Sequence, residues 1–324
     1  MKKLITMALA ATLIAITAAP AQAAQKQNTL KSTTLTPTLA ILDTALDTSI
    51  PSIKSRIVAE VCILDWPSCP NGKTFMEGPG ASSLPMSMLS TSSFNHGTQM
   101  VSAALLSNPN LNIVFVRIVG NTNRGTQQTY GLKTLVNALT WVNNNRAKYN
   151  IVAVASSHAT NTPVIRMKTE NYCLPTSLDP VILNLNSSGV PVFFPSGNSG
   201  LNPGMKDKIE WPACIKQSVA VGGVETLNLD RPQISLTSNY DKNLVDLWGE
   251  VHLPIINPGN VPGYAYGTSV SVQVIAAKYV QLKSSKPTYT LDQLITLMKS
   301  SSVPLEKINN QEVQLFDLLK AING

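Results

Sequence analysis

Short apolar runs that alternate with helical segments limit most strongly how this chain can fold. The runs, rich in Val, Ile, Leu and Ala, lie at 38–43, 111–119, 150–157, 189–194 and 219–222. Helical patterns separate them, from about residue 129 to 146 and again up to Ser187. Strands that alternate with helices predict βαβ units, in which parallel strands are joined by right-handed crossovers. We therefore predict the α/β class, with a mostly parallel central sheet flanked by helices.

The remaining segments fit a single domain, because the chain has no internal repeat and no second composition regime. Residues 51–93 are rich in Ser, Pro and Gly with little periodicity, which predicts an elaborated surface loop. Near the C-terminus, apolar periodicity at 291–298 and 313–322 predicts two helices that pack on the sheet. In the whole chain 44% of residues are hydrophobic and 13% are charged, a balance typical of folded proteins rather than disordered ones.

Residues 1–23 have the three parts of a secretory signal peptide. Two lysines precede an apolar run over 4–19, and small residues end at Ala23, after which we expect cleavage. Residues 24–37 are polar, show no apolar period and are predicted to form an extended arm. No later segment reaches about 18 uninterrupted apolar residues. We therefore expect no membrane span in the mature chain and a periplasmic or extracellular location.

The charge of the chain does not indicate a nucleic-acid partner. Without the two lysines of the signal, 23 basic residues face 18 acidic ones, and the basic residues are scattered rather than gathered into a stripe. Neither a G-x-x-x-x-G-K-[ST] nor a G-x-G-x-x-G motif follows a predicted strand, which disfavours a nucleotide-binding α/β protein. We therefore predict no nucleic-acid partner.

The four cysteines, an even number, suit an oxidising compartment. Cys62 and Cys69 bracket a short proline-containing loop, and Cys173 and Cys214 are the remaining two. We predict two disulfides in that pairing. A zinc site is the competing use of cysteines, but no CxxC or HxxxH pattern accompanies them, and we predict no metal there.

Three polar residues stand at the ends or starts of predicted elements. Asp43 closes the first apolar run, at the carboxyl end of a buried strand. His96 opens an apolar helix beside a glycine, whereas His158 and His252 are interpreted as surface or hydrogen-bonded residues. A glycine-containing loop that begins at Gly263 is predicted to run into another apolar helix, and Ser269 stands at the start of that helix, where unpaired backbone N–H groups favour negative charge. Taken singly, Asp43 is also explained as a turn residue and Ser269 as a helix cap.

Four segments together resemble the subtilisin-like serine peptidases, the subtilase family. They are Ile41–Asp47, His96–Met100, Pro195–Gly200 and Gly267–Ser271. Their key residues follow the order Asp, His, Asn, Ser, with gaps of 53, 102 and 71 residues that leave room for strands and crossovers. Each motif alone is weak, but four in one family's order, at their expected strand or helix ends, are specific. The resemblance covers residues 38–282 and implies a three-layer, subtilisin-like fold for a peptidase domain at 38–324.

The resemblance implies a serine endopeptidase and assigns a role to each key residue. Ser269 is the expected nucleophile, and His96 is the base that takes its proton and returns it to the leaving amine. Asp43 is expected to orient the imidazole and stabilise its charged form. Asn198 is the expected oxyanion-hole donor, together with the backbone N–H of Ser269. Taken alone, Asn198 is also explained as a turn residue that tolerates the left-handed conformation.

The resemblance also indicates where substrate binds. The strand that ends at Ser157 is similar to one wall of the family's primary specificity pocket, which assigns substrate binding to Ser156 and Ser157. Pro195, near the oxyanion asparagine, and Gly125, at the end of an edge segment over 120–125, complete the expected contacts. A polypeptide substrate would then bind as an added β-strand.

Departures from the family pattern bear on these expectations. Gln99 stands where a second histidine is usual, and Val270–Gln273 replaces the usual small residues and proline after the serine. Neither change touches an atom that transfers a proton. Phe193 and Phe194 replace a run of small residues before the oxyanion asparagine. We hypothesise that they narrow the pocket, which would then prefer small or unusual side chains before the scissile bond.

The segment before the first candidate residue and the metal content are further points of difference. About 20 residues lie between the predicted cleavage site and Asp43, too few for the folded inhibitory prodomain common in the family. We therefore expect unaided folding or assistance in trans. No cofactor is required for the expected chemistry. Structural calcium is frequent in the family, but we identify no ligand set, and Asp47 and Asp65 are better explained as solvated carboxylates.

Two functions remain open at this point. The first is a secreted serine endopeptidase that acts through an acyl-enzyme. The second is a catalytically weak or inactive subtilase-fold protein that binds peptides. A fluorophosphonate probe separates them, because label that disappears in Ser269→Ala requires an activated serine.

Overall fold

A computed structural model describes residues 36–122, 125–128, 131–160, 173–226, 232–241, 243–308 and 311–323 of the chain. The predicted signal peptide at 1–23 lies outside the described residues, as does the predicted arm at 24–37 apart from its last two residues. Among the helices within the described ranges, none is both long and apolar enough to cross a membrane.

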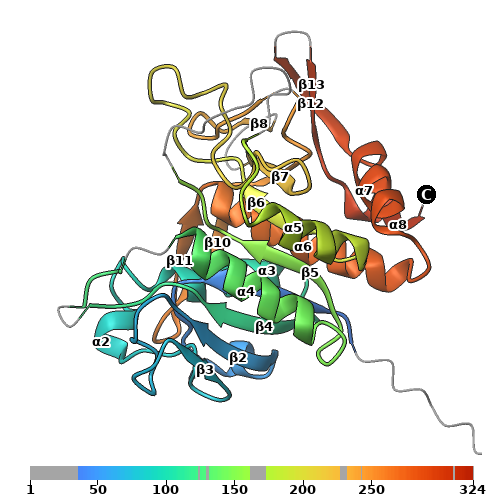
Figure 1. Ribbon diagram of the computed structural model, residues 1–324. Coiled ribbons are helices and arrows are strands. Elements are labelled where there is room, and N and C mark those ends of the chain that lie inside the picture. Colours follow the sequence, from blue (N-terminus) through green and yellow to red (C-terminus); the bar gives the residue numbers. More distant parts are fainter. Residues whose placement is uncertain are drawn as a thin grey trace, which may run out of the picture. The chain divides into compact units, whose positions relative to one another are not determined.

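Nine strands of the described chain form one sheet (Figure 1). Their spatial order is β3, β2, β4, β1, β5, β6, β7, β8, with β9 beside β7. The bounds are β1 Thr38–Asp43, β2 Ile57–Ile63, β3 Phe75–Glu77, β4 Asn112–Arg117, β5 Ile151–Ser156, β6 Val192–Pro195, β7 Val219–Glu225, β8 Gln233–Ile234 and β9 Leu247–Glu250. Neighbouring strands are parallel except for the pairs β2–β3 and β7–β8. The predicted α/β class with a mostly parallel sheet is confirmed.

The central strand β1 places one candidate residue at the carboxyl edge of the sheet. All six of its residues are buried, which is why the strand has the form of a continuous apolar run in the sequence. It pairs in parallel with β4 and β5, so that Asp43 lies opposite Arg117 and Leu42 lies opposite Ser156. The backbone at Asp43 is therefore held by strands on both sides.

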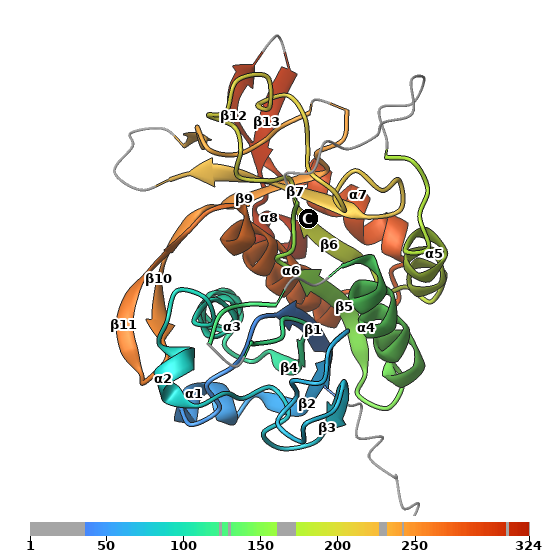
Figure 2. The same cartoon turned by 60° about the vertical axis from the view of Figure 1, so that its left-hand side comes forward.

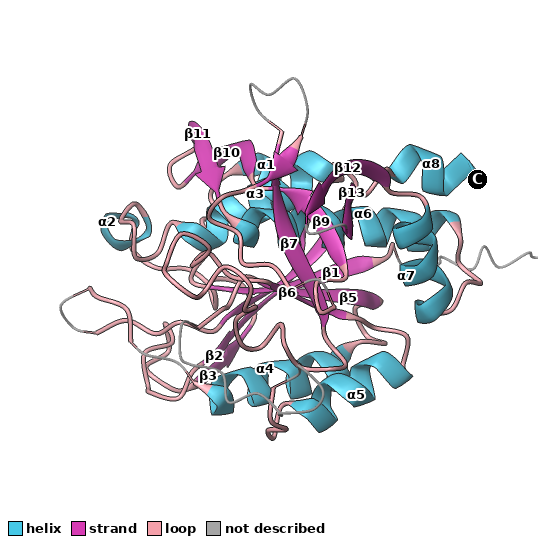
Figure 3. Ribbon diagram, turned by 90° about the horizontal axis from the view of Figure 1, so that it is seen from above, coloured by secondary structure: helices cyan, strands magenta, loops and turns pink. Residues whose placement is uncertain are grey.

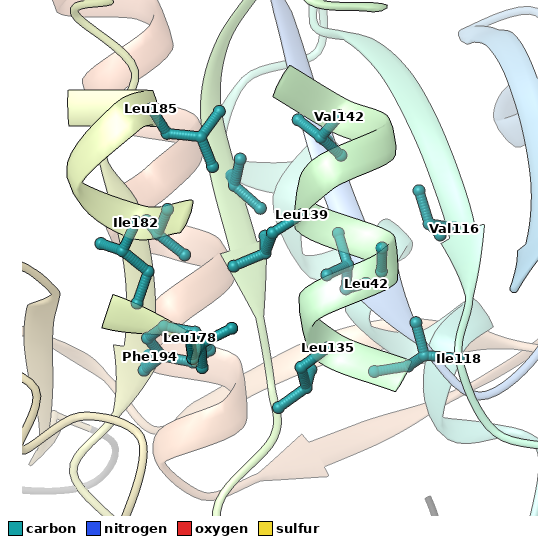
Figure 4. Close-up of a cluster of buried hydrophobic side chains, with 14 of the residues drawn as sticks. Leu42, Val116, Ile118, Leu135, Leu139, Val142, Leu178, Ile182, Leu185 and Phe194 are labelled. Atoms are coloured by element: carbon teal, nitrogen blue, oxygen red, sulfur yellow. The ribbon is translucent and has the colours of Figure 1, made fainter. Parts of the chain in front are cut away.

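Helices α4 (Leu132–Asn145) and α5 (Asp179–Ser187) cover one face of the sheet (Figure 3). Their inward side chains meet those of the strands in one buried cluster (Figure 4). It includes Leu42, Val116, Ile118, Leu135, Leu139, Val142, Leu178, Ile182, Leu185 and Phe194. Burying one such side chain contributes about 1.5–3 kcal/mol relative to leaving it exposed, so this layer is a main source of stability.

Helices α3 (His96–Ser107) and α6 (Thr268–Ser285) cover the opposite face (Figures 2 and 3). Of the 18 residues of α6, 13 are buried, and its apolar and small side chains are distributed all round the helix. Such a helix is enclosed by protein on every side. The further elements are α1 Pro51–Lys54, α2 Met86–Leu89, α7 Leu291–Ser300, α8 Leu318–Asn323, β10 His252–Asn257, β11 Val261–Tyr266, β12 Val303–Ile308 and β13 Gln311–Leu315.

The prediction of a surface loop over 51–93 is wrong for part of that segment. It contains α1, β2, β3 and α2, and β2 is a parallel strand of the main sheet. Residues 61–63 of β2 are buried against β4, whereas Ile57, Val58 and Ala59 are exposed or half-buried. An apolar pattern confined to half a strand is too short to be distinguished from a loop by periodicity alone.

The predictions around two hairpins are also wrong. Residues 313–315 of the predicted helix at 313–322 belong to β13, which pairs with β12, and the helix α8 begins only at Leu318. The segment before Ser269, predicted to be a loop, contains β11, which pairs antiparallel with β10. Pro254 and Pro262 conceal this hairpin in the sequence, because proline is tolerated in strands only at edges.

The predicted cysteine pairing is present in the structure. Cys62 is paired with Cys69, and Cys173 with Cys214. The first pair closes a loop that follows β2, and the second joins the segment before α5 to the segment before β7.

Candidate active site

Asp43 and His96 meet at the carboxyl edge of the sheet, at the end of β1 and the start of α3. Nδ1 of His96 lies 2.8 Å from Oδ1 of Asp43, and because a carboxylate can only accept, the imidazole N–H is the donor. The same oxygen accepts the backbone N–H of Thr44 at 2.7 Å. The Asp43 side chain is 2% exposed, whereas that of His96 is 34% exposed. The pair therefore joins a buried carboxylate to an imidazole that is partly open to solvent.

Thr44 and Gly97 fix the start of α3, on which His96 stands. The hydroxyl of Thr44 donates to the carbonyl of Phe94 at 3.1 Å and accepts the backbone N–H of Gly97 at 3.0 Å. A side chain on Gly97 would collide with the Ala45 carbonyl and the ring of Phe115. Glycine at this position therefore lets the helix start approach β1. The sequence gives no signal for the role of Thr44, because its partners lie about fifty residues away.

The environment of His96 changes its affinity for a proton. Burial lowers the pKa of the imidazole, but the charge of Asp43 and the hydrogen bond to it raise the pKa by more, so the net shift is upward. The imidazolium is thus stabilised by the carboxylate beside it. Such a pair is suited to a base that becomes transiently charged during a reaction.

Ser269 is the second residue of α6 and is 9% exposed. The chain turns into this helix at Gly267, whose φ of 118° is one that other residues rarely adopt. Side chains of α3 and α6 lie in one buried cluster, which includes Met100, Ala103, Val270 and Val274. The helix that carries Ser269 therefore packs against the helix that carries His96.

Asn198 lies on the turn after β6 and bonds to the same helix start. Its Oδ1 accepts the backbone N–H of Thr268 at 2.9 Å and the hydroxyl of Thr268 at 3.0 Å. Because both bonds use the oxygen, the NH2 of the amide is left to donate elsewhere, and the residue is exposed. The structure thus places an amide donor one residue from Ser269.

Glu210 is buried beneath this turn, a position that sequence reasoning missed. It is 3% exposed, and its carboxylate accepts the hydroxyl of Ser199 at 2.6 Å. Burial raises the pKa of Glu210, while the hydroxyl of Ser199 and the backbone N–H of Asn198 oppose that shift. The charged stretch at 206–208 just before it is typical of a solvated surface, so the sequence carries no signal of this burial.

Three of the predicted substrate-binding residues lie at neighbouring strand ends. Ser156 ends β5 and Pro195 ends β6, and these two strands are paired. Ser157 accepts a hydrogen bond at 2.9 Å from Gln273, a buried residue of α6. Gly125 lies apart from them, in a turn after β4 closed by its N–H to the carbonyl of Thr122 at 2.9 Å.

The structural basis of the predicted narrow pocket is wrong. Phe193 and Phe194 are both 0% exposed, and they belong to different core clusters on opposite faces of the sheet. Successive residues of a strand point to opposite faces, so both rings pack against helices. The two phenylalanines are therefore core residues, and the preference for small or unusual side chains loses the argument on which it was based.

His158, interpreted from the sequence as a surface or hydrogen-bonded residue, is buried at 8% exposure. Its ring lies edge-on to that of Trp211, with 5.9 Å between the centroids. Burial lowers the pKa of His158 to about 4, although the charge of Asp43 acts in the opposite direction. His158 is therefore a neutral imidazole near pH 7, on the chain that leaves β5 beside the candidate site.

The described residues contain no group of three or more His, Cys, Asp or Glu placed to hold a metal ion. Of the two carboxylates considered for calcium, Asp47 uses Oδ1 for the N–H and hydroxyl of Ser49 and Oδ2 for the N–H of Gly259. Asp47 is buried at 2% exposure, so its interpretation as a solvated carboxylate is wrong. Asp65 has a buried Oδ1 with no hydrogen-bond partner among the described residues.

An aspartate–histidine pair at the carboxyl edge of a mostly parallel sheet, with a serine at the start of a helix that packs on the histidine's helix, is compatible with a serine-type peptidase. Comparison with known proteins agrees, because the profile of the subtilase family matches residues 36–316. The chain belongs to the subtilase family and is a serine-type peptidase, whose substrates are polypeptides.

Individual relatives are distant. The chain is 24% identical over 257 residues to the major intracellular serine protease of Bacillus subtilis (strain 168), covering 76% of this chain and 68% of that protein. It is 24% identical over 220 residues to subtilisin E of the same strain, covering 65% of this chain and 51% of that one. The aligned region thus spans about half of the latter's length.

Solved structures share the fold. Fervidolysin from Fervidobacterium pennivorans, a keratinolytic enzyme related to subtilisin, superposes with a TM-score of 0.69 at 13% identity, covering 90% of this chain and 43% of that one. A lanthipeptide protease superposes with a TM-score of 0.64 at 15% identity, covering 89% of this chain and 87% of that one. At such identities the likeness concerns the fold alone.

Proposed function

We propose that the protein is a serine endopeptidase in which Asp43, His96 and Ser269 form the catalytic triad. The observation that carries the proposal is the 2.8 Å hydrogen bond between His96 and Asp43, formed at the start of α3, a helix that packs against α6. A buried carboxylate fixes the tautomer of the imidazole with Nδ1–H toward itself, so Nε2 is the basic nitrogen.

The proposed reaction has two proton transfers in each half. The hydroxyl oxygen of Ser269 attacks the scissile carbonyl carbon while its proton passes to Nε2 of His96. The resulting imidazolium, stabilised by Asp43, gives that proton to the leaving nitrogen as the C–N bond breaks, which leaves an acyl-enzyme. Water then attacks the acyl carbon while His96 takes its proton, and that proton passes to the Ser269 oxygen as the ester bond breaks, which releases the carboxylic acid product.

The tetrahedral intermediates carry negative charge on the former carbonyl oxygen. We assign its stabilisation to the NH2 of Asn198 and the backbone N–H of Ser269. Support comes from the two hydrogen bonds that hold Oδ1 of Asn198 on Thr268 and leave the amide donors directed away from it. The start of α6 adds the partial positive charge of a helix N-terminus.

We assign substrate binding to the carboxyl edge of the sheet. The chain on the acyl side would extend along residues 120–125 as an added strand that reaches Gly125, and its side chain before the scissile bond would lie between Ser156, Ser157 and Pro195. Support comes from the pairing of β5 with β6, which sets two of these residues at adjacent strand ends. The chemistry uses only side chains and backbone of this chain and requires no cofactor.

We also propose that the protein is exported through the signal at 1–23, to the periplasm or the extracellular medium. Two disulfide-linked cysteine pairs support an oxidising location. The mass and N-terminal sequence of the exported protein test this, and we expect the mature chain to begin at Ala24. A protein recovered with an intact N-terminus and four free thiols contradicts it.

A fluorophosphonate probe tests the proposed activity directly, because it reacts only with an activated serine. We expect purified protein to be labelled and Ser269→Ala to remain unlabelled. Ser271→Ala is the matched control, since this serine is buried on the same helix and its hydroxyl donates to the carbonyl of Glu250 at 3.1 Å. Folded wild-type protein that takes no label would instead assign the peptide-binding alternative.

A further inference from the structure

The direction of the Asn198 amide depends on the turn that carries it. Within the described structure its side chain is anchored only through Oδ1, to Thr268, and the residue is exposed. The residue before it, Gly197, has a φ of 117°, a conformation that other residues rarely adopt. An exposed side chain on such a turn needs support from the protein beneath it to keep one orientation.

Glu210 gives this support along the length of the turn. Its backbone N–H donates to the carbonyl of Ser196 at 2.8 Å. Its carboxylate accepts the hydroxyl of Ser199 at 2.6 Å, and the backbone N–H of Asn198 acts on it to lower its pKa. Its side chain also fills the space beside Gly197 that a side chain there would otherwise occupy. Glu210, 11 positions after Ser199, thus lies against Ser196, Gly197 and Ser199, on both sides of Asn198.

We propose that Glu210 is a positioning residue that holds the turn 196–199 and so aims the Asn198 amide at the oxyanion. The inference rests on the proposed function, because it names what sets the oxyanion donor in place. The side chain of Glu210 reaches the turn with an acceptor oxygen, which suits it to hold the hydroxyl of Ser199. Glu210 then holds the residues on both sides of Asn198, and Thr268 holds its side chain.

The size of the effect follows from what the oxyanion donor itself contributes. Removing such a donor lowers kcat by about 10²- to 10³-fold, which is the most that misplacing it can cost. A displacement of about 1 Å in a catalytic group can cost about 10²-fold. We therefore expect Glu210→Ala to lower kcat by about 10- to 100-fold with KM changed by less than about threefold.

Two further variants separate positioning from general stability. Glu210→Gln keeps the shape and an acceptor oxygen, and we expect it to recover most of kcat. Glu60→Ala is the matched control, because Glu60 is also a buried carboxylate that accepts a serine hydroxyl, from Ser82 at 2.7 Å, but on β2. We expect Glu60→Ala to lower the unfolding midpoint and to leave kcat of the folded protein unchanged.

The decisive measurement is a double variant. In an Asn198→Ala background, Glu210→Ala should lower kcat by less than about twofold further, because a positioning residue has nothing left to position. Multiplicative losses, or a loss confined to substrates with a cationic side chain before the scissile bond, would overturn the inference. If Asn198→Ala alone has no effect on an active wild type, the oxyanion assignment fails first, and if the wild type takes no fluorophosphonate label, the proposed function fails.

Discussion

Oδ1 of Asp43 lies 2.8 Å from Nδ1 of His96, although the two residues are 53 positions apart and stand on a strand and a helix. The strand β1 is fixed by β4 and β5, and the helix start is fixed by Thr44 and Gly97. The hydrogen bond is therefore a consequence of packing on both sides. Replacing one carboxylate oxygen of Asp43 with an NH2 group, as in Asp43→Asn, should remove the proposed function of this hydrogen bond.

Asp43→Asn is expected to lower kcat/KM by about 10⁴-fold while the protein stays folded. An amide can present a donor to Nδ1 and so favours the wrong tautomer of His96. Steady-state kinetics on a chromogenic peptide, with unfolding midpoints, measure this. Asp47→Asn is the matched control, because Asp47 accepts hydrogen bonds from Ser49 and Gly259 and has no contact with the imidazole. A loss of less than tenfold in Asp43→Asn would remove Asp43 from the triad.

The pH dependence of kcat/KM should show the raised pKa of His96. Burial lowers that pKa, but the charge of Asp43 and its hydrogen bond raise it by a larger amount. The imidazole therefore keeps its proton to a higher pH than a free histidine. Activity is then low in acid and rises through a midpoint above about 6.5. The stability due to the His96–Asp43 pair has the opposite trend, being complete below about pH 6.5 and lost as pH rises through the folded pKa. A kinetic midpoint well below 6.5 would contradict the assignment of His96 as the base.

Those parts of the fold that rest on local patterns could be predicted from the sequence. β1 is a continuous apolar run that ends at Asp43, and α3 begins at the histidine that precedes a glycine, so the positions of the candidate residues at element ends follow from the pattern. By contrast, β2 is apolar only in its second half, and β13 is recognisable only through its pairing with β12. Pairing between segments that are distant in the sequence produces no periodic pattern from which it could be predicted.

The supporting residues of the site could not be predicted for the same reason. Nothing in the sequence distinguishes Thr44 from the other threonines. Its role is evident only from the structure, in which its hydroxyl bonds to the carbonyl of Phe94 and the N–H of Gly97. Glu210 has the sequence context of a surface acid. Only the hydrogen bond from its backbone N–H to the carbonyl of Ser196 shows that it lies beneath the turn. Residues that transfer protons belong to short sequence motifs, whereas the residues that position those catalytic residues are identified only from their contacts in the folded structure.

Asn198→Ala is expected to lower kcat by about 10²- to 10³-fold and to leave KM nearly unchanged, because the oxyanion forms only after binding. Thr268→Val should have a smaller effect, since it removes one of the two donors to Oδ1 and keeps the backbone donor. Asn202→Ala, at an exposed asparagine of the same loop, is the matched control and should leave kcat unchanged. Equal rates for Asn198→Ala and wild type would exclude the amide from the oxyanion hole.

Acid should destabilise the protein through His158. Burial lowers its pKa to about 4 in the folded chain, so between about pH 6.5 and 4 the unfolded chain binds the proton more readily. This contribution to stability is complete above about pH 6.5 and falls by about 3 kcal/mol as pH reaches the folded pKa. Denaturant unfolding of wild type and His158→Gln at pH 7 and pH 4.5 measures it, and the variant should lose less stability in acid. Parallel losses in both proteins would contradict the prediction.

The two disulfides should differ in their contribution to stability. The residues of the Cys62–Cys69 pair are 7 positions apart, and those of the Cys173–Cys214 pair are 41 apart. Because a longer closed loop removes more entropy from the unfolded chain, replacing the first pair by alanines should cost about 2.5 kcal/mol and the second about 4 kcal/mol. Denaturant unfolding of the two double variants measures the difference, with reduced wild-type protein as the common reference in which both pairs are open. If the Cys62–Cys69 variant is the less stable of the two, loop entropy does not decide the ranking, and the loss arises from the packing of Cys62 in β2.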